Sequence, residues 1–121
     1  MIGIGAIFMA LGVILGAFGA HGLENRLTPE KIAVFKTGVD YHLFHALGMI
    51  AIGILAAQRG ISGGLLSGAF GCLLGGVILF SGSLYWLSLG GPRWLGPVTS
   101  IGGSLFIVGW GLLAWSAIRG S

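Results

Sequence analysis

Long segments without a charged residue dominate this sequence and decide what it can fold into. They run over about residues 2–20, 41–57, 63–89 and 97–118. A helix needs roughly 20 apolar residues to cross a bilayer, because each residue advances it by about 1.5 Å. Only 7% of the 121 residues are charged, whereas a soluble domain has about 25%. The sequence therefore predicts one integral membrane domain over residues 1–121, an all-α, glycine-rich bundle of four transmembrane helices in contact with the lipid bilayer.

The second of these segments is short for a span, but a helix start precedes it. Thr28 is a suitable N-cap, Pro29 suits the first helical position, and Glu30 is favoured there by the helix dipole. We therefore expect one continuous helix from about Pro29 to Ala57. Its first third is amphipathic and its remainder is buried in the membrane.

The titratable residues are confined to one short part of the chain. Every histidine and every acid lies between His21 and His45, and only Arg59, Arg93 and Arg119 carry charge outside that window. The net charge of +3 is small and scattered, which argues against nucleic acid as a partner. Titratable chemistry would thus be restricted to one side of the membrane.

The charges also predict an orientation. Four spans place both termini on one side, and the loops at residues 21–40 and 90–96 on the other. The loop side holds four basic residues against two on the side of the termini. The positive-inside rule therefore predicts cytoplasmic loops and external termini in the cell (inner) membrane.

The chain holds 25 glycines, and their spacing gives the strongest signal for helix packing. At 100° per residue, two stripes form: Gly5, Gly12, Gly16 and Gly19 on the first span, and Gly64, Gly68, Gly71, Gly75 and Gly82 on the third. A glycine costs about 1 kcal/mol in a helix interior, and close packing between membrane helices can offset that cost. We therefore expect the first and third spans to contact each other, or an identical partner, through these stripes.

Polar side chains near the helix ends define a candidate interfacial cluster: His21, Asp40, His42, His45, Ser81, Ser83, Tyr85 and Thr99. His45 lies about one turn inside the second span, and we expect it to bond a polar group of the first or fourth span, such as Thr99. Facing imidazoles from His21 and His45 could ligate a metal or haem. No cysteine or acid completes such a site, so the metal question stays open and no cofactor is expected.

Four motifs resemble one family over nearly the whole chain: Gly16-Ala17-Phe18-Gly19-Ala20-His21-Gly22-Leu23, Tyr41-His42-Leu43-Phe44-His45-Ala46-Leu47, Leu79-Phe80-Ser81-Gly82-Ser83-Leu84-Tyr85 and Val98-Thr99-Ser100-Ile101-Gly102-Gly103. The sequence is similar to the domain of unknown function 423 family, small four-span membrane proteins that resemble transmembrane protein 256. Ser100 stands where the family pattern usually has proline. The resemblance implies the fold and the membrane location, and it implies no activity.

The function predicted is that of a small binding or accessory subunit with several spans and no reaction assigned to it. Ionisable groups inside a membrane usually mark ion paths, and the first, third and fourth spans hold none between their ends. The nucleophile elbow of hydrolases and the phosphate-binding loop are also missing, which favours a non-enzymatic role. Two alternatives stay open: a homo-oligomeric pore or small-solute facilitator, and a redox or metal-binding protein that uses the histidines. A homo-oligomer or a larger membrane complex would be the partner.

Overall fold

The computed structural model describes residues 1–60 and 64–120, and within them the regular elements are helices. Four helical stretches are long and apolar enough to span a membrane, which confirms the predicted fold class. The elements are α1 (Ile2–His21), α2 (Pro29–Arg59), α3 (Gly64–Gly76), the π-helical turn η1 (Val77–Ser81), α4 (Gly82–Ser88) and α5 (Leu95–Arg119). α3, η1 and α4 together form the third span. Its predicted start at residue 63 lies outside the described residues.

The second span is one helix of 31 residues, longer than a bilayer requires. It begins as the sequence predicts, since the Thr28 side chain accepts a hydrogen bond from the Lys31 backbone and Pro29 opens the first turn. It ends at Gly60, whose φ of 66° is left-handed and favours glycine. At about 1.5 Å per residue α2 is about 46 Å long, so its amphipathic start extends beyond a hydrocarbon core of about 30 Å.

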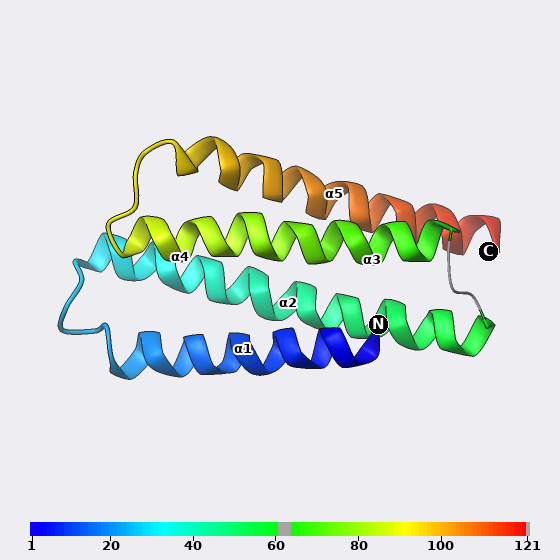
Figure 1. Cartoon of the computed structure of the whole chain (residues 1–121), viewed down its shortest axis with the longest axis horizontal. Coiled ribbons are helices and arrows are strands. Elements are labelled where there is room, and N and C mark those ends of the chain that lie inside the picture. The colour runs from blue at the N-terminus through cyan, green and yellow to red at the C-terminus, as the bar shows by residue number, and fades with distance from the viewer. Residues whose placement is uncertain (61–63, 121) are drawn as a thin grey trace.

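α2 is the central helix of the bundle. In Figure 1 α1 lies along α2, and α5 lies along the third span. Within the most apolar window of each span, half of α2 is buried, against 17% of α1 and 22% of α5. α1 and α5 therefore present most of their surface outward, while α2 contacts α1, α3, η1 and α4.

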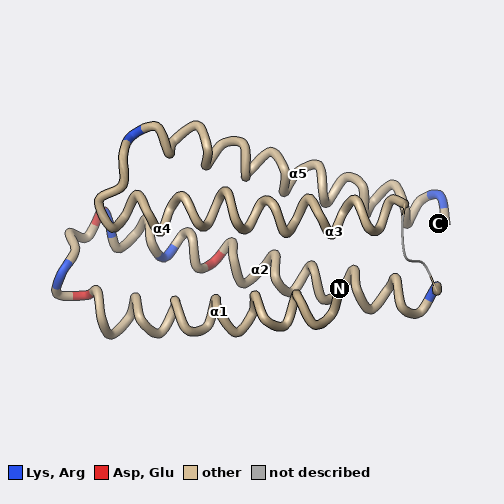
Figure 2. Tube along the Cα trace, in the orientation of Figure 1, with Lys and Arg blue, Asp and Glu red and all other residues tan. Residues whose placement is uncertain are grey.

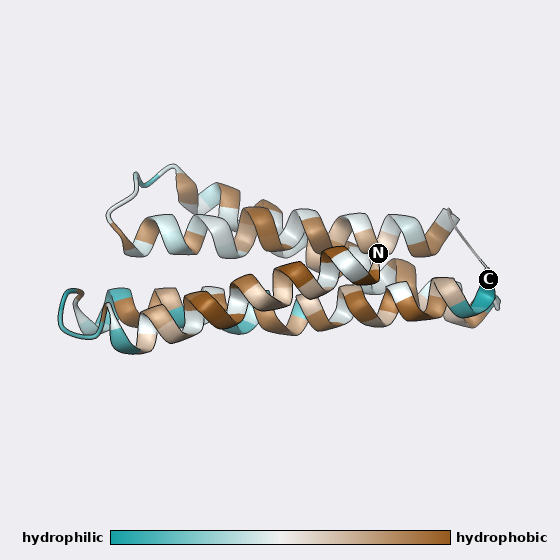
Figure 3. Ribbon diagram, turned by 60° about the horizontal axis from the view of Figure 1, so that its bottom comes forward, coloured by the Kyte–Doolittle hydropathy of each residue, from teal (hydrophilic) through white to brown (hydrophobic). Residues whose placement is uncertain are grey.

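The surface of the bundle fits a lipid environment. Most Lys, Arg, Asp and Glu lie toward the two ends of the bundle, and the innermost blue and red marks lie on α2 (Figure 2). Hydrophobic residues run along the helices (Figure 3), and many of them are exposed, with Phe44 and Ile107 at 68% and 74%. The chain termini point toward one end of the bundle, opposite the α1–α2 and α4–α5 turns (Figure 1).

The glycines of α1 face α2, so the expected contact between the first and third spans is wrong. A Cβ at Gly5 would lie 2.7 Å from Ile50, and one at Gly19 would lie 2.6 Å from Phe35. Gly16 faces Val39 in the same way, at 3.3 Å. Helices joined by a short turn usually pack side by side, and the turn between α1 and α2 spans only residues 22–28.

The glycines of the third span form a looser stripe than the sequence suggests. Cβ atoms at Gly68 and Gly75 would lie 3.3 Å from Leu112 and Leu105 of α5, whereas Gly64, Gly71 and Gly82 face open space within 4 Å. The closest approaches between α5 and the third span occur elsewhere, at Gly76, Gly102 and Gly109. A contact of the open glycines with an identical partner stays a prediction.

Gly12→Leu and Gly71→Leu form a matched pair of variants. A Cβ at Gly12 would lie 2.7 Å from Leu43 and 3.1 Å from the His42 ring, whereas one at Gly71 would meet nothing within 4 Å. We expect Gly12→Leu to lower the free energy of unfolding by about 1–3 kcal/mol. Gly71→Leu should raise that of the monomer by up to about 1 kcal/mol, because it replaces a helix-interior glycine without a clash. Both are measured by thermal unfolding in detergent. Equal shifts would contradict these packing roles. A loss of stability for Gly71→Leu together with loss of an oligomer would support the identical-partner contact.

Candidate functional site

His42 joins three helices through both of its ring nitrogens. Its Nε2 lies 2.7 Å from the Phe8 carbonyl oxygen of α1, and its Nδ1 lies 2.8 Å from the Tyr85 hydroxyl of α4. A carbonyl only accepts, so Nε2 carries the proton. In the neutral ring Nδ1 then accepts, and the Tyr85 hydroxyl donates to it.

Gly12 provides the room for this bridge. It lies one helical turn after Phe8, and a Cβ at position 12 would come within 3.1 Å of the His42 ring. The imidazole therefore passes over the glycine to reach the carbonyl of Phe8. This contact explains why that position of α1 carries no side chain.

Serines of the third span tie it to both neighbouring helices. The Ser81 hydroxyl, at the end of η1, donates to the Gly38 carbonyl of α2 at 2.7 Å. The hydroxyls of Ser83 and Thr99 bond to each other, and Thr99 also donates to the Leu95 carbonyl at 3.0 Å. Within the described part of the chain, no buried side-chain nitrogen or oxygen lacks a hydrogen-bond partner.

His45 faces α5 and makes a different set of contacts. Its Nδ1 lies 2.7 Å from the Tyr41 carbonyl one turn earlier, so Nδ1 donates. Its ring stacks on Phe106 with the centroids 3.6 Å apart and the planes at 15°. The expectation that His45 bonds Thr99 or another polar group of the first or fourth span is therefore wrong. Its Nδ1 bonds the backbone of its own helix, and its ring packs on Phe106.

The Nε2 of His45 is left as an acceptor without a partner among the described residues. The residue is only 7% exposed. Because no fully buried side-chain nitrogen is unpaired in that part of the chain, Nε2 must reach the molecular surface, and the surface that His45 lines is that of a groove between α2 and α5. His45 is thus a nearly buried imidazole with one nitrogen open to that groove.

This groove has a volume of about 550 Å³. We call it the α2–α5 groove; its lining residues are Tyr41, His45, Phe80, Ser100, Gly103, Ser104, Phe106, Ile107 and Trp110. Pockets of about 300–1,000 Å³ lined by apolar and aromatic groups with a few polar atoms are typical of small-molecule sites. The groove has the size and the lining of a ligand site.

The stacking of His45 on α5 gives its position along the bundle. Its stacking partner Phe106 lies close to the midpoint of α5, whose bounds are Leu95 and Arg119. His45 therefore lies near the middle of the bundle, where ionisable side chains are rare.

The eight residues of the predicted polar cluster do not form one site. The structure brings together His42 with Tyr85, and Ser83 with Thr99. Ser81 bonds the backbone of α2 and His45 faces the α2–α5 groove, whereas His21 and Asp40 are exposed.

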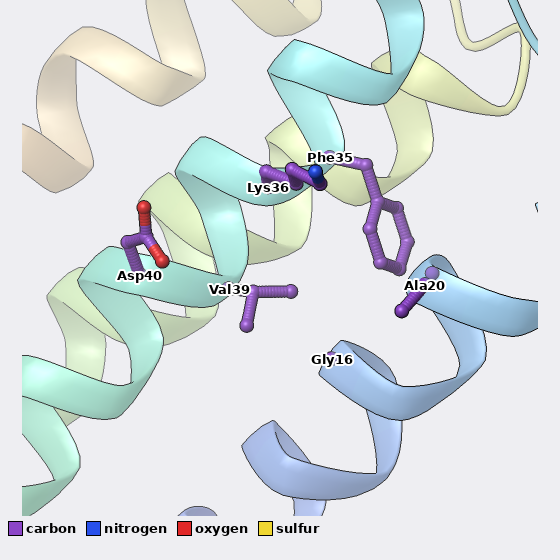
Figure 4. Close-up of a pocket in the computed structure, with 7 residues that line it drawn as sticks. Gly16, Ala20, Phe35, Lys36, Val39 and Asp40 are labelled. Atoms are coloured by element: carbon purple, nitrogen blue, oxygen red, sulfur yellow. The ribbon is translucent and has the colours of Figure 1, made fainter. Parts of the chain in front are cut away.

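A second pocket, of about 210 Å³, lies between α1 and α2. Figure 4 shows Phe35 and Val39 reaching from α2 toward α1, with Lys36 and Asp40 along the same helix. Asp40 thus lies at this pocket, away from the contacts of His42 and His45.

Most residues of the groove were not predicted from the sequence. The stripe Ser100, Gly103, Ser104, Ile107 and Trp110 follows helical spacing along α5 and could have been found as one face of that helix. Its individual residues carry no strong chemical signal, and Tyr41 and Phe80 come from other elements.

Metal ligation has no ready site in the described ranges. No group of three His, Cys, Asp or Glu side chains gathers in residues 1–60 and 64–120. His21 ends α1 while His45 faces α5, on the other side of α2. The facing pair of imidazoles that the sequence suggested is not formed.

Comparison with known proteins identifies the chain. The model of the family described as protein of unknown function (DUF423) matches residues 15–103. The chain is 43% identical over 117 residues to the UPF0382 membrane protein YwdK of Bacillus subtilis, covering 96% of this chain and 94% of that one. It is 41% identical over 116 residues to the UPF0382 inner membrane protein YgdD of Escherichia coli, covering 95% and 83%. No solved structure matches it. The chain belongs to the DUF423 family of membrane proteins.

Proposed function

We propose that the protein is a small, non-catalytic binding subunit of the membrane, which holds a lipid-soluble molecule in the α2–α5 groove. One observation carries this proposal: the open Nε2 of His45, on a side chain 7% exposed, at mid-bundle beside a groove of about 550 Å³. An unpaired polar atom in an apolar medium costs about 1–3 kcal/mol, and a ligand that bonds Nε2 would recover that cost.

The surroundings of His45 favour binding over catalysis. No Asp, Glu, Lys or Arg lines the groove, so the imidazole has no charged partner there to orient it for proton transfer. The groove is open on the outer side of the bundle, where Ser104 and Ile107 are exposed. A molecule dissolved in the bilayer can therefore enter sideways from the lipid.

The test compares Ser104→Trp with Val108→Trp. Ser104 lines the groove, whereas Val108 is 50% exposed on α5 and is not part of the lining. Each protein is purified in lipid nanodiscs, and its bound small molecules are measured by native mass spectrometry. We expect the wild type and Val108→Trp to retain a bound molecule that Ser104→Trp loses. Equal retention by all three, or no bound molecule in the wild type, would refute the proposal.

We infer that the protein lies in the cell's inner membrane, with residues 21–40 and 90–96 in the cytoplasm and both termini outside. Arg26, Lys31, Lys36 and Arg93 on the loop side outnumber Arg59 and Arg119, which supports this orientation. The name of the Escherichia coli relative places that protein in the inner membrane.

Cysteine labelling tests the orientation. With Cys72 replaced, a single cysteine is placed at Arg93 or at Gly120, and intact cells are treated with an impermeant thiol reagent. We expect label at position 120 and none at position 93, because the reagent cannot cross to the cytoplasm. Label at position 93 alone would reverse the orientation.

As a subunit, the protein is proposed to work in a homo-oligomer or a larger membrane complex. The low burial of α1 and α5 supports this, since both helices leave most of their apolar surface free for lipid or for another protein. Purification in a gentle detergent with mass spectrometry of everything bound tests the proposal. A monomer that carries no other protein would refute it.

A further inference from the structure

We infer that the α2–α5 groove selects a lipophilic aromatic alcohol, a neutral phenol-type molecule whose hydroxyl donates to His45 and whose ring packs among the aromatic side chains. This inference rests on the proposed function, because it names the ligand class of the same groove. Three properties of the groove lead to it: the hydrogen-bonding state of its polar atoms, its rings and its lack of charge.

The polar atoms at and near His45 are acceptors, so the ligand must be a hydrogen-bond donor. The proton of the ring sits on Nδ1 and is given to the Tyr41 carbonyl, 2.7 Å away, so the neutral ring can only accept at Nε2. The hydroxyls of Ser100 and Ser104 donate to the Gly96 and Ser100 carbonyls at 3.5 and 3.0 Å, which leaves their oxygens as acceptors. An O–H group satisfies Nε2, whereas an ether or a ketone leaves it unpaired.

Two side chains of the lining carry donors of their own. Tyr41 and Trp110 are 43% and 42% exposed, and each has one polar hydrogen. A hydroxyl is both a donor and an acceptor, so its oxygen can accept from one of them while its proton goes to His45. This combination favours an alcohol over a ligand that only accepts or only donates.

The rings of the groove favour a flat aromatic ligand. Tyr41 and Phe80 have centroids 4.6 Å apart, Phe80 and Phe106 lie 5.5 Å apart at 56°, and Trp110 lies 5.7 Å from His45. Aromatic pairs in such offset or tilted arrangements gain attraction beyond the area that they bury. A saturated ring of the same size would bury a similar area without that gain.

The lack of charge excludes most lipid headgroups. The lining holds no Lys or Arg to bind a phosphate and no acid to bind an amine. An ion at mid-bundle would lose its hydration without compensation. The ligand is therefore neutral, with its hydroxyl as the polar part.

Three probes that differ by one feature each test the inference: para-octylphenol, para-octylanisole and para-octylcyclohexanol. The anisole lacks the donor, and the cyclohexanol lacks the aromatic ring. Binding to the protein in nanodiscs is measured by quenching of tryptophan fluorescence, to which Trp110 in the lining contributes, and by saturation-transfer NMR. We expect the phenol to bind about tenfold more tightly than either analogue, as loss of one hydrogen bond or one ring contact predicts.

Variants separate the contribution of the hydrogen bond to His45 from that of the aromatic contacts. His45→Phe keeps a flat ring against Phe106 and removes the acceptor, so the preference for phenol over anisole should disappear while the preference over cyclohexanol remains. Ser104→Trp should block all three probes, and Val108→Trp should block none.

The outcomes distinguish this inference from the proposed function. Equal binding of phenol and anisole to the wild type, or a preference that survives in His45→Phe, would overturn the selectivity; the wild-type comparison needs no variant to fold. If all three probes bind equally and Ser104→Trp blocks them, the groove is a binding site of another selectivity. If Ser104→Trp blocks none of them, the proposed function fails as well.

Discussion

Gly102→Ala is expected to separate α5 from the third span. A Cβ at this position would overlap the backbone nitrogen of Phe80 and lie 2.8 Å from its Cα. Backbone atoms of a helix cannot rotate away, so the two helices must move apart. We expect a loss of about 3 kcal/mol in the free energy of unfolding, the upper end of the overpacking range, measured by unfolding in mixed detergent micelles.

Two glycines of the same helix serve as controls. A Cβ at Gly111 would have nothing within 4 Å, and one at Gly103 would lie 3.6 Å from the Phe80 ring, an ordinary contact. Gly111→Ala should therefore raise the free energy of unfolding by up to about 1 kcal/mol, because it replaces a helix-interior glycine without a clash, and Gly103→Ala should not lower it. Similar losses for Gly102→Ala and Gly111→Ala would contradict the close approach.

The Gly102 contact also holds the groove in place. Phe80 belongs to η1 and lines the α2–α5 groove together with Phe106, which lies four residues after Gly102 on α5. A shift of α5 would move Phe106 away from the ring of His45. Loss of packing at Gly102 should thus weaken ligand binding as well as stability.

The spans and the start of α2 could be predicted because they depend on local properties. The length of an apolar run sets a span, and Thr28 and Pro29 set the start of a helix wherever it packs. The partner of each helix depends on how whole faces fit. The spacing of Gly5, Gly12 and Gly19 identifies a face of α1 but does not tell that Phe35, His42 and Ile50 of α2 fill it.

Part of the candidate site could also be predicted, because it depends on where residues lie along a helix. His42 and Tyr85 were placed in one predicted cluster because both lie near a helix end. Their side chains form a hydrogen bond, although 43 residues of sequence separate them. The stacking of His45 on Phe106 could not be read from the sequence, because it depends on how α2 and α5 are placed side by side. The groove also needs residues from three elements, which only the packed bundle brings together.

His42→Ala is expected to loosen α1 and α4 together. The ring bonds the Phe8 carbonyl of α1 and the Tyr85 hydroxyl of α4, and the residue is 4% exposed. Its removal deletes two hydrogen bonds, leaves the Tyr85 hydroxyl without its acceptor and opens a cavity, for which we expect a loss of about 3 kcal/mol in the free energy of unfolding. His21→Ala, on an exposed side chain, is the control and should change stability by less than about 0.5 kcal/mol.

A double-mutant cycle with Tyr85→Phe separates the hydrogen bond from the cavity. Tyr85→Phe alone removes the donor to His42 Nδ1 and should cost about 1 kcal/mol. In the His42→Ala background that bond is already lost, so the same change should cost almost nothing, and the two variants should be non-additive by about 1 kcal/mol. The cavity left by His42→Ala is present whether residue 85 is tyrosine or phenylalanine, so its cost cancels in the cycle. Additive losses would show that the contact between His42 and Tyr85 contributes no coupling, and the stability of the bundle would then rest on ring packing and on the bond to Phe8.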